Sequence, residues 1–166
     1  DIAGNAYAGT DSITFTIDNT APTVNLTDTD ADNVVKDSDN VTITATFNEA
    51  MTTAPTVSIS GLVTNTVMTA VSSITWTYLW DVPAGNDGSV TATVSGADSI
   101  GNAYTDSDSI TFTIDNTAAQ IVTSTLNLEN SLISLQFNEA LYSTNNGSGA
   151  LEVTDFVYSI SGGPAT

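Results

Sequence analysis

Hydrophobic and polar residues alternate along several short segments of the chain. Every second residue of segment 41–47 is apolar, with threonines between, and segment 109–114 repeats this alternation. A period of two residues is typical of a β-strand with one buried face. Clusters of Gly, Pro, Asn, Asp and Ser separate these segments from the other candidates. The remaining predicted strands lie at about 23–26, 56–60, within 62–70, 73–80 and 89–95.

The fold class follows from the number and spacing of these strands. Seven strands within residues 21–117, with turns at short intervals, are typical of an immunoglobulin-like β-sandwich. The β-branched residues Val, Ile and Thr are abundant and favour strands, whereas the helix formers Lys, Glu and Gln are scarce. The chain contains no cysteine, so it lacks the disulfide of antibody domains. We therefore predict an all-β chain of tandem immunoglobulin-like β-sandwich domains with no disulfide.

The chain repeats itself, and the repeats set the domain boundaries. Residues 1–21 recur as residues 98–118, a shift of 97, with 16 of 21 positions identical. The sequence Phe-Asn-Glu-Ala at 47–50 recurs at 137–140, a shift of 90. This period is too long for a solenoid and suits one sandwich domain per repeat. We expect residues 1–20 to be the C-terminal strand of a preceding domain, 21–117 a complete domain, and 118–166 the N-terminal half of the next.

The charge composition excludes several classes of function. The chain has 19 acidic residues, one Lys and no Arg or His, a formal net charge of −18. Such a chain cannot neutralise phosphates, so nucleic acids and anionic membrane surfaces are excluded as partners. It has neither His nor Cys for nucleophilic or general-base catalysis, so we expect no enzymatic activity. No apolar run approaches the ~18 residues of a membrane span, so we expect no membrane insertion in this segment.

The acidic residues lie between the predicted strands, where loops meet the domain linkers. In an immunoglobulin-like sandwich, the loops after 41–47 and after 89–95 share one end with the incoming linker. Carboxylates this dense repel each other unless a cation intervenes, and a site made only of oxygen ligands selects Ca²⁺ ahead of Mg²⁺. The alternative is an acidic surface that is simply solvated. The predicted Ca²⁺ ligands are Asp18, Asn19, Glu49, Asp98 and Asn102 at the incoming junction, and Asp115, Asn116 and Glu139 at the outgoing one.

A less complete metal-binding pattern precedes segment 41–47. Asp28, Asp30 and Asp32 match the opening of an EF-hand loop. The Gly and the closing Glu that such a loop requires are absent. An acidic β-turn is therefore the alternative interpretation of these three residues.

Segment 73–80 carries a row of large side chains on one face, namely Ile74, Trp76, Tyr78 and Trp80. Such a row could stack on sugar rings. A sandwich of this size without a disulfide needs large buried side chains, however. We therefore expect Trp76 to lie in the core, with glycan binding as the alternative.

Several short motifs together carry a family resemblance. Asp-x-x-Gly-Asn occurs at 1–5 and 98–102, and Asp-Asn-Thr-Ala-Pro at 18–22, in addition to the two copies of Phe-Asn-Glu-Ala. In this order and spacing they resemble the bacterial Ig-like tandem repeats of giant cell-surface adhesins, of the marine and Bacteroidetes type. The resemblance covers essentially the whole chain.

The resemblance implies a stalk segment at the bacterial cell surface. Repeats of this family form extended stalks, stiffened by Ca²⁺, between the cell and its target. Partners would be neighbouring repeats of the same chain and other copies in a filament. Asp-Ser-Ile, which occurs three times, resembles an O-glycosylation acceptor of Bacteroidetes, with loop punctuation as the alternative; the candidates are Ser12, Ser99 and Ser109. The alternative function is a glycan-binding or accessory Ig-like module of a secreted or phage protein.

Overall fold

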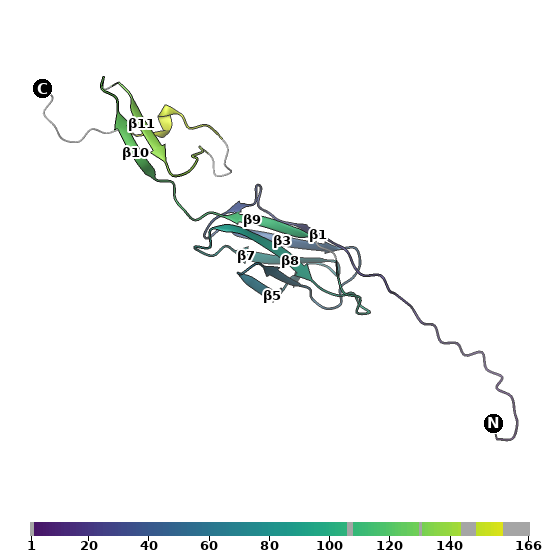
Figure 1. Cartoon of the computed structure of the whole chain (residues 1–166). Helices are drawn as coiled ribbons and strands as arrows, with labels where there is room; N and C mark the ends of the chain where they lie inside the picture. The colour runs from purple at the N-terminus through teal and green to yellow at the C-terminus, as the bar shows by residue number, and fades with distance from the viewer. Residues whose placement is uncertain (1, 106–107, 130, 144–148, 158–166) are drawn as a thin grey trace.

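The structure, a computed structural model, describes residues 2–105, 108–129, 131–143 and 149–157. These residues form strands and one 3₁₀ helix, with no α-helix among them, so the all-β prediction is confirmed (Figure 1). The elements are β1 (Val24–Thr27), β2 (Val34–Val35), β3 (Asn40–Phe47), β4 (Thr56–Ile59), β5 (Val63–Val67), β6 (Thr69–Ala70), β7 (Thr75–Asp81), β8 (Gly88–Ser95), β9 (Ser109–Ile114), β10 (Ile121–Leu126), β11 (Ile133–Phe137) and η1 (Val153–Asp155).

The first nine strands form two sheets. One sheet has the order β1-β3-β7-β6, and its neighbours are all antiparallel. The other has the order β2-β9-β8-β4-β5, in which β2 runs parallel to β9 and the other pairs are antiparallel. The two sheets lie face to face (Figure 1).

The core between the sheets consists of the side chains that the alternation placed inward. The four apolar residues of segment 41–47 and the three of segment 109–114 are all buried. Trp80 of β7 packs against Phe112 of β9 across the two sheets, with ring centroids 5.3 Å apart. Trp76 and Trp80 are 8% and 2% exposed, so the expectation of a core role for Trp76 is confirmed. Tyr78 is half-buried and packs against the core, whereas Ile74 is exposed.

Two features of the sheets were not predicted. The pair Val34–Val35 forms β2 inside the acidic segment before β3, held to β9 by backbone bonds from Thr113 N–H to Asn33 O (2.8 Å) and from Asp115 N–H to Val35 O (2.9 Å). The predicted strand within 62–70 is divided at the buried Met68. Its first part, β5, pairs with β4 in one sheet, and its second part, β6, pairs with β7 in the other.

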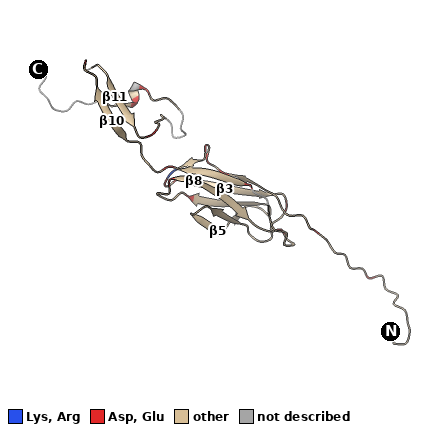
Figure 2. Cartoon of the chain, viewed as in Figure 1, with Lys and Arg blue, Asp and Glu red and all other residues tan. Residues whose placement is uncertain are grey.

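Charge is nearly absent from the strands. Asp81, the last residue of β7, is the only charged residue within the strands that the structure describes. The other described acidic residues lie outside the strands, in the loops, in η1 and in the segment before β1 (Figure 2, red).

One sequence is found in two environments. Residues 108–114 and residues 11–17 are identical, yet the former contain β9 while no strand lies within residues 2–20. The side chains of Ile13, Phe15 and Ile17 are about four-fifths exposed (79%, 79% and 81%). A single strand without a partner sheet is not stable in water, which explains the difference from β9.

Residues 118–143 contain the antiparallel hairpin β10–β11. Its start reproduces a pair of hydrogen bonds found between the residue after β3 and the residue before β1. Asn138 after β11 accepts a hydrogen bond from Gln120 N–H through Oδ1 (2.6 Å) and donates its own N–H to Gln120 O (3.0 Å). Asn48 after β3 makes the same two bonds with Thr23 (2.7 and 3.1 Å). The second Phe-Asn-Glu-Ala motif thus recreates the local geometry of the first.

Candidate metal centre

Three acidic side chains from distant parts of the sequence meet at one end of the sandwich. Asp18 lies in the incoming segment, Glu49 follows β3, and Asp98 follows β8. One carboxylate oxygen from each lies within 4.8 Å of the others. Among the described residues this is the only group of three such ligands found so close together. All three are among the ligands that the sequence predicts for the incoming junction.

The loop after β8 holds Asp98 in place. Asp98 Oδ1 accepts hydrogen bonds from the backbone N–H groups of Ile100 (2.9 Å), Gly101 (2.7 Å) and Asn102 (2.8 Å). Gly101 has φ +107°, a conformation that L side chains rarely adopt, so the tight loop needs glycine here. In the motif Asp-x-x-Gly-Asn at 98–102, the carboxylate of the first residue therefore holds the loop by accepting hydrogen bonds from its backbone N–H groups.

Asn102 joins this loop to the incoming segment. Its Nδ2 donates to Asp98 Oδ2 (2.7 Å) and to the backbone carbonyl of Asp18 (3.1 Å). Asn102 was predicted as a ligand, whereas its amide nitrogen acts here as a donor that positions two of the three acids. Asn19, the neighbouring candidate, is exposed.

Asn48 was not predicted as a site residue, although its two bonds with Thr23 fix the incoming chain beside Glu49. A signal for it was present in the sequence. Asn48 recurs as Asn138 within Phe-Asn-Glu-Ala, at the same distance before a glutamate in each copy.

The electrostatics of the three acids differ. Burial, and then the charges of Asp18 and Asp98, raise the pKa of Glu49 above its ordinary value of 4.5. Burial alone would raise the pKa of Asp98 as well. The hydrogen bonds from the Asn102 side chain and from the three backbone N–H groups outweigh that effect and hold the Asp98 pKa below 3.8. The group therefore combines a carboxylate, that of Asp98, whose ionised form is stabilised with another, that of Glu49, whose ionised form is disfavoured.

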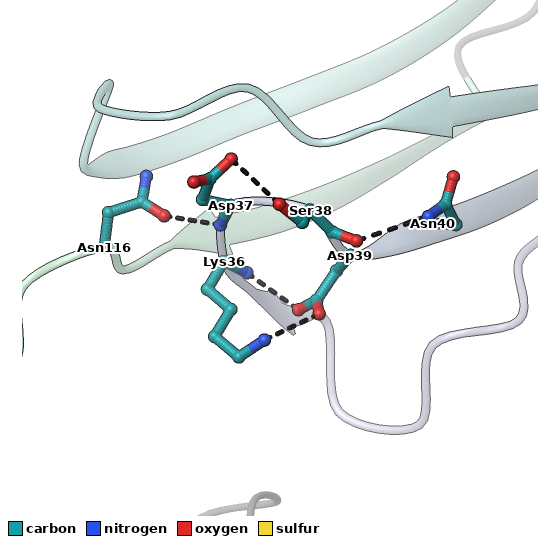
Figure 3. Close-up of polar contacts among 6 residues, drawn as sticks. All are labelled: Lys36, Asp37, Ser38, Asp39, Asn40 and Asn116. Carbon is teal, nitrogen blue, oxygen red and sulfur yellow. Dashed lines mark hydrogen bonds and ion pairs between the residues drawn. The ribbon is translucent and has the colours of Figure 1, made fainter.

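No cation of the chain relieves this repulsion. Lys36, the chain's one basic residue, pairs with Asp39 (2.9 Å) in the turn between β2 and β3 at the other end of the sandwich (Figure 3). Three carboxylates without nitrogen or sulfur ligands are the donor set of a hard divalent cation. A divalent cation bound here would offset the repulsion among the three carboxylates.

The candidate residues of the outgoing junction are arranged differently. Asn116 Oδ1 accepts from Asp37 N–H (Figure 3), Asn116 N–H donates to Asp87 Oδ1 (2.8 Å), and Thr117 Oγ1 donates to Asp87 Oδ2 (2.6 Å). These bonds hold residues 116–117 against the loop between β2 and β3 and the loop between β7 and β8. Asp115 is exposed, and its Oδ1 accepts from Thr117 N–H (3.0 Å). Glu139 Oε1 is buried, with no hydrogen-bond partner found in the described part of the chain.

The candidate acids before β3 form successive turns. Asp28 Oδ1 accepts from Asp30 N–H (2.8 Å), Asp30 Oδ1 from Asn33 N–H (2.6 Å), and Asp32 Oδ1 from Val34 N–H (3.1 Å). Asp30 and Asp32 line an open hollow of about 480 Å³ together with Asp39 and Asp115. Each carboxylate accepts a hydrogen bond from a backbone N–H two or three residues later in the chain. This is the geometry of an acidic turn, the alternative interpretation of these residues.

Ser12, Ser99 and Ser109 are all exposed, so each is accessible for modification. Within the described residues, no helix is both long and apolar enough to cross a bilayer.

Acidification tests the bonds around Asp98. Because its folded-state pKa is depressed, Asp98 contributes stability above pH 3.8, and this stability is lost as the pH falls through the folded-state pKa. We expect the free energy of unfolding, measured by urea titration in chelator, to fall over that window. Asp98→Asn keeps an acceptor oxygen but cannot titrate, so its unfolding free energy should depend less on pH there. Equal pH slopes for the two proteins would contradict this account of the loop.

Comparison of the chain with protein-family models, with curated proteins and with solved structures found no match.

Proposed function

We propose that the chain is a stalk segment of a long, repetitive bacterial surface adhesin, built from tandem immunoglobulin-like domains whose junctions bind Ca²⁺. The observation that carries the proposal is the convergence of Asp18, Glu49 and Asp98. One acid belongs to the segment that enters the domain and two to the domain itself. A cation shared by the three would tie the incoming segment to the domain.

The sheet orders support an immunoglobulin-like assignment. The order β1-β3-β7-β6 corresponds to the A-B-E-D sheet of such domains, and β9-β8-β4 to the G-F-C sheet. In this scheme β2 is an additional strand beside G, and β5 an additional strand beside C. The repeat length of the sequence supports one such domain per repeat.

The junction also has features that limit bending without a metal. Pro22 is buried and restricts the backbone of the incoming segment. Thr23 is tied to Asn48, and the Asp18 carbonyl to Asn102. The bonds between Gln120 and Asn138 repeat the first of these ties at the next junction. In the proposed stalk, calcium would therefore stiffen a connection that packing has already oriented.

The glycan-binding alternative loses its main support. The indole rings that would form a sugar platform are those of Trp76 and Trp80, and both lie in the core. Location at the bacterial surface and association with other copies in a filament remain part of the proposal through the resemblance of the motifs to adhesin repeats.

A polypeptide with residues 21–117 in two tandem copies tests the function. Its internal junction places the second domain's Glu49 and Asp98 next to the first domain's Asp115, the equivalent of Asp18 in the repeat. Small-angle scattering should give a longer and more narrowly distributed maximum dimension in millimolar Ca²⁺ than in chelator. Glu49→Gln in the second copy should abolish the difference, whereas Glu49→Gln in the first copy serves as the matched control. Identical scattering with and without Ca²⁺ would rule out a calcium-stiffened stalk.

A further inference from the structure

The linker tripeptide, residues 115–117 (Asp-Asn-Thr), follows β9 and repeats residues 18–20. Both copies form the same turn, in which Oδ1 of the Asp accepts a hydrogen bond from the Thr N–H two residues later (2.9 Å and 3.0 Å). In the first copy this Asp is Asp18, which lies with Glu49 and Asp98 in the acidic group. Asp115 is therefore the residue that corresponds to Asp18 at the outgoing junction.

The other two residues of the linker tripeptide contact the domain that the chain is leaving. Asn116 N–H donates to Asp87 Oδ1 (2.8 Å), and Thr117 Oγ1 donates to Asp87 Oδ2 (2.6 Å). Asn116 Nδ2 also donates to Gly85 O, and its Oδ1 accepts from Asp37 N–H (Figure 3). Both carboxylate oxygens of Asp87 thus accept hydrogen bonds from two consecutive linker residues.

The loop between β7 and β8 has an unusual backbone at Asp87. Asn86 and Gly88, the residues on either side of it, have φ of +61° and +127°. Such values are uncommon outside glycine and mark sharp turns of the chain. The hydrogen bonds from the Thr117 hydroxyl, and then from Asn116 N–H, hold the Asp87 pKa below 3.8. Asp87 is therefore ionised at neutral pH, and bonds to a charged acceptor are stronger than those between neutral groups.

The chain is also fixed on the far side of the linker tripeptide. Gln120, five residues after Asp115, exchanges two hydrogen bonds with Asn138 (2.6 and 3.0 Å). The spacing is the same at the incoming junction. Glu139, which corresponds to Glu49 in the repeat, has its Oε1 buried with no hydrogen-bond partner found in the described part of the chain. Asp115 thus lies between two points at which hydrogen bonds hold the chain.

We infer that Asp87 is a positioning residue for the Ca²⁺ site of the following junction. Through its bonds with Asn116 and Thr117 it fixes the linker tripeptide, and so it holds Asp115 ready to share a cation with the acids of the next domain. A ligand that is ordered before binding loses less conformational freedom when the cation binds, so these bonds raise the affinity for Ca²⁺. The inference rests on the proposed function and adds the preceding domain to each junction.

The test uses the full chain with residues 21–117 present twice in succession. The internal junction then contains the first copy's Asp87 and Asp115 together with the second copy's Glu49 and Asp98. In the parent protein, Glu49→Gln in the first copy and Glu139→Gln remove a ligand from each of the other two junctions. Isothermal titration with Ca²⁺ then gives the dissociation constant of the internal site.

Thr117→Val in the first copy removes the donor hydroxyl and changes no charge. We expect the dissociation constant for Ca²⁺ to rise roughly 2- to 10-fold, the range that corresponds to ordering one side chain. Thr117→Ser keeps the hydroxyl and should retain the parent affinity. Thr117→Val in the second copy is the matched control and should leave the dissociation constant unchanged. A role confined to the stability of the first domain would not change Ca²⁺ affinity at carboxylates of the second.

Asp87→Asn in the first copy tests the other partner of the same bond. It should weaken Ca²⁺ binding, and adding Thr117→Val to it should weaken binding little further, because both substitutions remove one interaction. The inference is overturned if the parent binds Ca²⁺ and Thr117→Val in the first copy binds it equally well, or if the control in the second copy weakens binding as much. A parent that binds no Ca²⁺ would overturn the proposed function as well.

Discussion

Millimolar Ca²⁺ should raise the melting temperature of the chain by roughly 10–20 °C over its value in chelator. Binding to the folded state alone at 100-fold saturation adds about 2.7 kcal/mol. In a domain of this size each kcal/mol shifts the midpoint by about 4–8 °C. The proposed ligands are the carboxylates of Asp18, Glu49 and Asp98, and one oxygen from each lies within 4.8 Å of the others. Differential scanning calorimetry with and without Ca²⁺ measures the shift.

The effect of Glu49→Gln on the melting temperature should have opposite signs in chelator and in Ca²⁺. The folded-state pKa of Glu49 is raised, so its contribution to stability is complete below pH 4.5 and is lost as the pH rises through the folded-state pKa. At pH 7 in chelator, the ionised carboxylate is therefore unfavourable, and Glu49→Gln should melt at a higher temperature than the wild type. In Ca²⁺ the variant should melt lower, because a ligand is gone. Glu152→Gln, an exposed substitution of the same kind, is the control. A wild-type melting temperature that is the same in Ca²⁺ and in chelator would exclude the proposed Ca²⁺ site.

Trp76→Ala should destabilise the central domain by about 3–5 kcal/mol, as truncation of large core residues does. The ring is 8% exposed, and its Nε1–H is buried with no acceptor found among the described residues. Trp76→Phe keeps most of the apolar volume and removes that donor, so its cost should stay below about 1.5 kcal/mol. Leu79→Ala, at an exposed position of the same strand, should change the unfolding free energy by no more than about 0.5 kcal/mol. Urea unfolding measures all three. A small loss for Trp76→Ala would show that the ring adds little to the core.

The strands could be predicted where alternation was regular, and not where it was interrupted. β3 and β9 have clear two-residue periods and lie within one residue of their predicted bounds. β2 was not predicted, because two valines among aspartates show no alternating pattern. Only their pairing with β9 makes them a strand. The division of segment 62–70 into β5 and β6 was not predicted either. A segment that crosses from one sheet to the other has the same composition as a single continuous strand.

The candidate site was predictable through topology more than through local sequence. Asp18, Glu49 and Asp98 are far apart in the chain, and only the assignment of loops to sandwich ends brought them together. The side chains that position them were harder to foresee. Asn48 and Asn102 act by hydrogen bonds to backbone groups, whose locations the sequence pattern does not specify.

The parallel pairing of β2 with β9 has a mechanical consequence. The chain enters the central domain beside Glu49 and leaves it beside Asp87, at opposite ends, so tension on the chain acts along the strands. Under such a load, the bonds of Asn33 and Val35 with β9, and that of Leu26 with Asp108, are sheared together and do not open one after another. We expect the rupture force of the domain to depend on this short edge of the sandwich more than on the size of its core.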